Sequence, residues 1–294
     1  MILDHPAIGS VPDDHFLAVL DAVLPSRRGV VAVLKAYFDA SERPDGTFCV
    51  AGFAFAKEQV KKFDKEWWAL FGAYGGCHMK ELAHRTGRFK GISTEESIRL
   101  IKRAVAIINK RTSFGIAVSC YTDEMAQVLP KWIDGFQGAY PVCCHMAMTA
   151  LGSKVQESGH DDEIAYFFES GDKHSGAAHR FMGKADESPE LKASYRHRSH
   201  TFIGRDSALP LQSADIFAWE FTKYWDETAQ KRIRLMRKSL VALLSKGAAN
   251  YDKKKYKLLH LSGPPLQRFA TSVARLGLLQ IEEDGIRKNR PYAA

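Results

Sequence analysis

Stretches of continuous apolar residues alternate along the chain with stretches whose apolar positions recur at helical spacing, and this alternation predicts an α/β fold. The continuous stretches predict strands at 30–39, 48–56, 113–121, 162–170 and 200–204. Helical spacing predicts helices at 13–24, 57–74, 95–110, 136–157 and 211–225. The turn "ERPDGT" (42–47) predicts an antiparallel hairpin from the first two strands, because Pro presets φ and Asp-Gly tolerates positive φ.

The order of these elements is that of a ribonuclease-H-like fold, a mixed five-stranded sheet flanked by helices, although other mixed sheets share it. In that topology the first and fourth strands lie side by side and run parallel. We expect an N-terminal helical extension at 1–29 and a core at 30–228 with a helical insertion at about 57–112. A basic and mostly helical C-terminal extension is expected at 229–294.

Two of the predicted strands stop at an acid. The first ends at Asp39 in "AYFDASE", and the fourth ends at Glu169 in "AYFFESGD". If these strands are parallel neighbours, both carboxylates lie at the same edge of the sheet, where open α/β sheets place their sites. Taken alone, each acid is also typical of a turn that follows a strand.

A third acid, Asp215, lies in "PLQSADIFAW" near the start of a predicted helix with mostly apolar neighbours. An ionised carboxylate in such surroundings is costly unless it is paired, holds a metal ion or is stabilised by the helix N-terminus. Gln212 shares its helix face and is a candidate to orient it or to contact substrate. Glu81 in "HMKEL" points the same way as His78 if this segment is a helical turn, and a solvated surface turn is the alternative.

The motifs "YFDAS", "HMKEL", "FFESGD" and "LQSADIFAW" together resemble the bacterial and phage domain-of-unknown-function 3800 family, over roughly 30–225. The resemblance implies a ribonuclease-H-like, metal-dependent nuclease whose acid cluster is formed by Asp39, Glu81, Glu169 and Asp215, with His78 beside it. Two features depart from the family pattern. The first motif reads Asp-Ala-Ser where Asp-Glu-Ser is usual, and Glu169 stands where an Asp is common. Both departures are compatible with a site that no longer cleaves.

The charge of the chain favours a polyanionic partner. The 294 residues carry a formal net charge of +8, and the segment 231–257 holds ten Lys or Arg against one acid. A solvated helix face is one reading of this segment, and a surface that contacts phosphates is the other. On the second reading the candidate nucleic-acid contacts are Lys231, Arg232, Arg234, Lys253, Lys254 and Lys255.

We therefore predict a nuclease that uses Mg²⁺ or Mn²⁺, because both ions prefer carboxylate oxygens. Asp39 is expected to bridge two ions, Glu169 and Asp215 to hold one each, and Glu81 to complete the set, while His78 assists proton transfer. One alternative is a catalytically degenerate nucleic-acid-binding or assembly module of a phage-defence or mobile-element system. Another is a hydrolase of a small phosphorylated nucleotide.

The sequence also predicts a cytoplasmic protein without a membrane segment. No apolar stretch reaches the roughly 18 residues that cross a bilayer, and the N-terminus lacks the pattern of a signal peptide. Five cysteines without framework spacing favour free thiols in a reducing compartment. A homo-oligomer and a defence-system partner protein both remain open.

Overall fold

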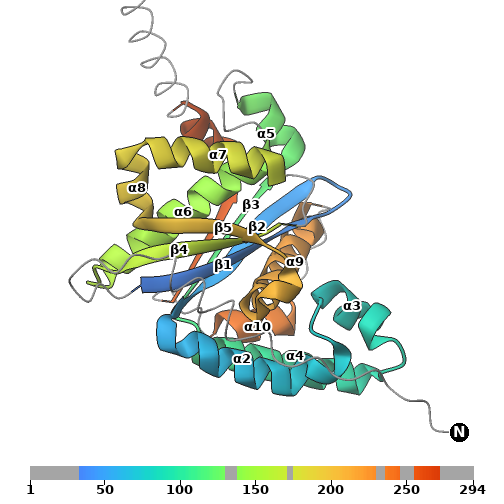
Figure 1. Ribbon diagram of the computed structural model, residues 1–294. Coiled ribbons are helices and arrows are strands. Elements are labelled where there is room, and N and C mark those ends of the chain that lie inside the picture. Colours follow the sequence, from blue (N-terminus) through green and yellow to red (C-terminus); the bar gives the residue numbers. More distant parts are fainter. Residues whose placement is uncertain (1–32, 130–137, 171–174, 230–235, 246–254, 272–294) are drawn as a thin grey trace, which may run out of the picture.

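The computed structural model describes residues 33–129, 138–170, 175–229, 236–245 and 255–271. In this part of the chain the fold is α/β, with a six-stranded mixed sheet in the order β5-β4-β1-β2-β3-β6 and helices on both faces (Figure 1). The strands are β1 (Val33–Glu42), β2 (Thr47–Ala56), β3 (Phe114–Tyr121), β4 (Glu163–Glu169), β5 (His197–Ile203) and β6 (Tyr256–Leu261).

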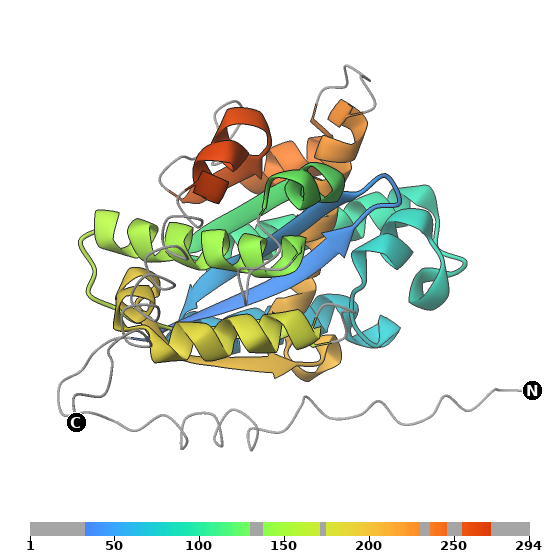
Figure 2. The same cartoon turned by 90° about the horizontal axis from the view of Figure 1, so that it is seen from above.

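The helices form two layers, one on each face of the sheet (Figures 1 and 2). On one face, the long helix α9 packs against β1 and β2. The helices of this layer are α2 (Lys57–Phe71), α3 (Met79–His84), α4 (Thr94–Arg111), α9 (Leu209–Ala229) and α10 (Lys238–Leu244). The opposite layer holds α5 (Thr122–Val128), α6 (Ala139–Glu157), α7 (Ser175–Glu187) and α8 (Pro189–Tyr195). None of the described helices is long and apolar enough to span a bilayer.

The central pairing of the sheet confirms the predicted topology. β1 runs antiparallel to β2 and parallel to β4, so the first and fourth strands are parallel neighbours. The predicted end of the first strand was wrong, because β1 continues past Asp39 to Glu42 while it pairs with β2. Its pairing with β4 does end at Phe38, opposite Phe168. Asp39 therefore lies where β1 loses its neighbour on that side.

The sheet has one strand more than the five predicted. β6 pairs in parallel with β3, so residues 256–261 of the predicted helical C-terminal extension belong to the sheet. An apolar stretch of six residues gives too weak a signal to separate a strand from a helix. The predicted N-terminal extension, 1–29, lies outside the described residues.

Alternation along the strands separates two apolar cores. In β1, Tyr37 faces the α9 layer and Phe38 faces the α6 layer, and in β4 Phe167 and Phe168 divide in the same way. Side chains that alternate along a strand continue this pattern. Asp39, two residues after Tyr37, and Glu169, two after Phe167, therefore both belong to the α9 face.

Candidate active site

Asp39 is buried at the carboxyl end of the β1–β4 pair. Asp39 is only 4% exposed, and its Oδ1 accepts a hydrogen bond of 2.7 Å from the backbone N–H of Ala40. The other oxygen, Oδ2, is buried without a hydrogen-bond partner. A buried carboxylate oxygen without a donor is costly, so this oxygen requires a cation or a proton.

Asp215 reaches the same place from α9 and fixes the start of α3. Its Oδ2 accepts a hydrogen bond of 2.6 Å from the backbone N–H of Met79, and His78 Nδ1 lies 3.3 Å from the same oxygen. The N–H of Met79 is one of the first-turn donors of α3 that have no partner within the helix. Asp215 thus caps α3 and holds His78 beside the acids.

The three acids Asp39, Glu169 and Asp215 act on one another electrostatically. Burial raises the pKa of Asp39 well above its usual range, and the nearby carboxylates of Asp215 and Glu169 raise it further. Arg205 opposes this effect. The structure therefore brings together three of the four predicted acids, from β1, β4 and α9.

Arg205, which the sequence analysis did not single out, lies among these acids. One of its terminal nitrogens is 3.5 Å from Asp39 Oδ2. Burial disfavours its charge, but the carboxylates of Asp215, Asp39 and Glu169 outweigh burial, and the pKa of Arg205 is raised. It belongs to a short 3₁₀ turn, Arg205–Ser207, that follows β5. The sequence signal for Arg205 was its position two residues after β5, which runs parallel to β4 and ends at the same edge of the sheet.

Glu81, the fourth predicted acid, is directed elsewhere. Its Oε2 accepts a hydrogen bond of 3.1 Å from the backbone N–H of Arg88. A Cβ atom added at Gly87 would lie 2.5 Å from the Glu81 carboxyl carbon, so the carboxylate packs against this loop. The structure thus gives Glu81 a role in holding the turn that follows α3.

Gln212, predicted to orient Asp215 or contact substrate, is buried and makes internal hydrogen bonds. The residue is 1% exposed, and its Oε1 accepts hydrogen bonds of 2.8 Å from both Trp67 Nε1 and the backbone N–H of Cys77. These partners place Gln212 inside the fold, where it supports the chain that leads into His78.

The predicted basic contacts lie away from the acids or outside the described residues. Lys231, Arg232, Arg234, Lys253 and Lys254 lie in segments that the structure does not describe. Lys255 precedes β6, which is three strands from β1, or about 14 Å at about 4.8 Å per strand. Its Nζ donates a hydrogen bond of 3.0 Å to the carbonyl of Asn109. Lys255 is therefore remote from Asp39.

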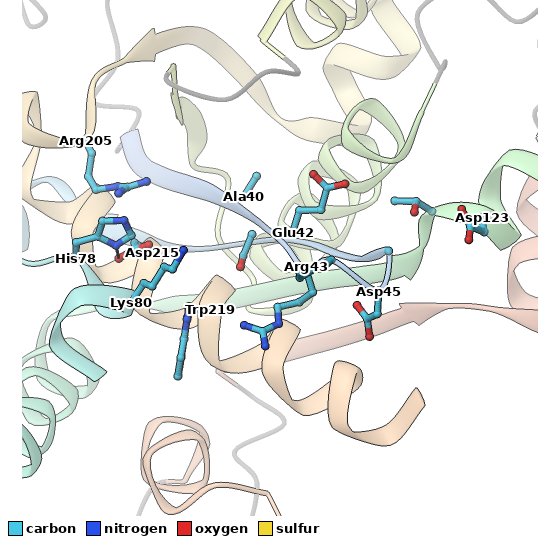
Figure 3. A pocket seen from close by; sticks show the side chains of 14 residues that line it. Ala40, Glu42, Arg43, Asp45, His78, Lys80, Asp123, Arg205, Asp215 and Trp219 are labelled. Atoms are coloured by element: carbon cyan, nitrogen blue, oxygen red, sulfur yellow. Dashed lines mark ion pairs between the residues drawn. The ribbon is translucent and has the colours of Figure 1, made fainter. Parts of the chain in front are cut away.

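A different set of basic side chains stands next to the acid cluster. A cavity of about 810 Å³ opens beside Asp215, and Figure 3 shows His78, Lys80 and Arg205 directed toward that carboxylate. Its lining is Ala40, Ser41, Glu42, Arg43, Pro44, Asp45, Gly46, His78, Lys80, Thr122, Asp123, Arg205, Asp215 and Trp219. Cationic groups next to a carboxylate cluster suit a phosphate group that must approach the acids.

The donor set fits Mg²⁺ or Mn²⁺ in its chemistry, since it consists of carboxylate oxygens and one of them lacks a hydrogen-bond donor. One ion does not reach all three acids as they stand. In the described part of the chain, the group of three ligand residues with atoms within 4.8 Å of one another is elsewhere, at Asp186, His197 and His200. Carboxylates that are too far apart to share one ion can still bind a pair of ions about 3.5–4 Å apart.

No protein-family model matches the chain, and no curated protein matches it. The fold is similar to that of a chain in the solved PCNA:RNase HII complex from Archaeoglobus fulgidus. The two share 11% sequence identity with a TM-score of 0.35, over 83% of this chain and 90% of that chain. A likeness this distant concerns the fold and carries no activity with it. The resemblance to the domain-of-unknown-function 3800 family is not confirmed by a family match.

Proposed function

We propose that this protein is a divalent-metal-dependent nuclease that hydrolyses phosphodiester bonds of RNA or DNA. One observation carries the proposal. The carboxylate of Asp39 is buried with one oxygen lacking a hydrogen-bond donor, beside two further acids and a cavity whose mixed lining of acidic and basic side chains includes Lys80 and Arg205. Such an arrangement of buried acids destabilises the fold, and it is found at metal-binding sites because the bound ion compensates the negative charge.

The roles follow from where each side chain lies. Asp39, Glu169 and Asp215 are the residues that would hold Mg²⁺ or Mn²⁺, and a bound ion would supply an activated water and relieve charge on the leaving oxygen. His78 Nδ1 lies 3.3 Å from Asp215 Oδ2 without a hydrogen bond to it, so the imidazole stands beside the acids, where it would carry a proton. Lys80 lines the cavity and binds the phosphate backbone, and Gln212 positions the chain that carries His78.

The test is cleavage by Asp39→Asn in a panel of RNA, DNA and nucleoside triphosphates with Mn²⁺ or Mg²⁺. We expect the rate to fall at least about 100-fold, the loss typical when a group that stabilises transition-state charge is removed. Asp123→Asn is the matched control, because Asp123 lines the same cavity outside the acid cluster. Wild-type cleavage by Asp39→Asn would exclude the assignment.

A second candidate is favoured by the position of Arg205. A guanidinium 3.5 Å from Asp39 supplies the positive charge that a metal ion would otherwise bring. The protein would then bind nucleic acid through the cavity without cutting it. This function predicts salt-dependent binding with no turnover in any divalent ion. The substrate panel separates the two candidates, because only the nuclease yields products.

A further inference from the structure

A second cluster of ligating side chains lies on the opposite face of the sheet, away from the acids. His197 and His200 belong to the edge strand β5, and Asp186 lies near the end of α7. Both histidines align with Ile164 and Tyr166 of β4, whose side chains belong to the core under α6, α7 and α8. The acid cluster lies on the α9 face.

A β-bulge brings the two histidines to one side of the strand. β4 pairs Ile164 with His197 and the next residue with Ser199, so Arg198 is an extra residue in β5. In a regular strand, residues three apart point to opposite faces. The extra residue restores His200 to the face of His197, and bulges often redirect side chains in this way at functional sites.

Two of the distances between the ligand atoms are close to those around a tetrahedral zinc ion. His197 Nε2 lies 3.3 Å from His200 Nδ1, and His200 Nδ1 lies 3.6 Å from Asp186 Oδ2. Zn–N and Zn–O bonds of about 2.0–2.2 Å in a tetrahedron place neighbouring ligand atoms about 3.3–3.5 Å apart. The contact between His197 and Asp186 joins Nδ1 and Oδ1 at 3.6 Å, and one ligand atom from each residue lies within 4.8 Å of the other two, so adjustment of the side chains completes the set for one ion.

The surroundings favour binding of a metal by these histidines. The His197 side chain is 5% exposed and its ring stacks on Tyr166 with an interplanar angle of 14°, so its orientation is fixed. Lys192 competes for the carboxylate, since its Nζ lies 3.7 Å from Asp186 Oδ1. That ammonium is exposed and easily displaced.

We propose that Asp186, His197 and His200 form a zinc site that fastens the end of α7 to the edge strand β5. Three protein ligands leave the fourth position to water, which reaches the site because the Asp186 side chain is 43% exposed. The ion would join two segments that are otherwise connected through α8, and would stabilise the edge of the sheet. This site is independent of the proposed nuclease activity, because it lies on the other face.

The experiment measures Zn²⁺ binding to the full chain after removal of metals with a chelator. Zn²⁺ affinity is taken from competition with a chromophoric chelator, and Co²⁺ serves as a spectroscopic substitute whose d–d absorption reports tetrahedral ligation. All proteins carry Asp39→Asn, so that an ion at the acid cluster is not counted. We expect one equivalent bound, with affinity at least about 10-fold lower in Asp186→Asn and in His200→Gln.

The control variant is His160→Ala, which removes an exposed imidazole from the loop after α6. It should bind Zn²⁺ as the Asp39→Asn parent does. Zn²⁺ should also raise the Tm of the parent and of His160→Ala, but not that of Asp186→Asn. His197 is left intact because its burial makes misfolding of a variant a competing explanation. Equal affinity in the parent and both ligand variants, or no tight binding by the parent, would overturn the proposal.

Discussion

The position of Arg205 among three acids makes a quantitative prediction for Arg205→Gln. At 3.5 Å and an effective dielectric constant of about 20, the attraction between its guanidinium and Asp39 is about 5 kcal/mol. Burial of the guanidinium opposes this attraction, as its effect on the pKa of Arg205 shows. The net loss on substitution is therefore smaller than the Coulomb energy.

An upper limit comes from protonation, because the folded variant can always relieve the repulsion by binding one proton. At pH 7 that costs about 1.36 × (7 − 3.9), or about 4 kcal/mol, for an Asp with an unfolded pKa near 3.9. At pH 5 the same limit is about 1.5 kcal/mol. We therefore expect Arg205→Gln to lose up to about 4 kcal/mol of unfolding free energy at pH 7 and at most about 1.5 kcal/mol at pH 5.

The assay is urea unfolding of the metal-free protein at both pH values, repeated with saturating Mn²⁺ at pH 7. If the acids hold Mn²⁺, the ion replaces the lost positive charge and restores most of the stability of Arg205→Gln. Arg99→Gln is the control, since Arg99 forms an exposed, solvent-screened pair with Glu96 whose loss should leave stability nearly unchanged at both pH values. A loss below about 0.5 kcal/mol at pH 7, or a loss that does not shrink at pH 5, would refute the reasoning.

Three further predictions concern two residues around the site and one partly buried acid of α2. Gln212→Leu leaves the donors of Trp67 and Cys77 without their buried acceptor, so we expect about 2–4 kcal/mol less unfolding free energy in urea titrations. Lys80→Ala should weaken nucleic-acid binding and lower the slope of log affinity against log salt by about 1, measured by fluorescence anisotropy. Burial raises the pKa of Asp64 to about 7, so its folded pKa exceeds the unfolded one and stability falls as pH rises through 7. Asp64→Asn should therefore gain up to about 4 kcal/mol at pH 8 and almost nothing at pH 4, measured by thermal unfolding.

The meeting of Asp39 and Glu169 could be predicted from the sequence because it depends on strand order alone. Two apolar stretches that end in acids, placed as parallel neighbours, bring those acids to one edge. The structure has this pairing, with Phe38 opposite Phe168 one residue before the acids. The involvement of Asp215 could also be predicted from the sequence, since a carboxylate in an apolar helical turn needs a partner.

The remaining parts of the site depend on contacts that no local pattern encodes. Glu81 lies in the predicted HMKEL turn, but its carboxylate is used by the backbone of Arg88, seven residues later. Arg205 and Lys80 are single basic residues with no periodicity, and they matter only because the fold brings β5 and α3 beside Asp215. The bulge at Arg198 is likewise set by pairing with β4.

The charge balance at the acid cluster connects the two candidate functions. Three ionised carboxylates and one guanidinium leave a net charge of about −2 if His78 is neutral, in a site where Asp39 is 4% exposed. Such a charge is not retained without compensation, and the compensation is either protons or a divalent cation. If a proton compensates the charge, Asp39 stays neutral and the protein is a binding module, whereas a divalent ion would favour the ionised form of Asp39 and support a nuclease. Arg205 reduces the charge that must be compensated, and so it sets how readily the site takes either one.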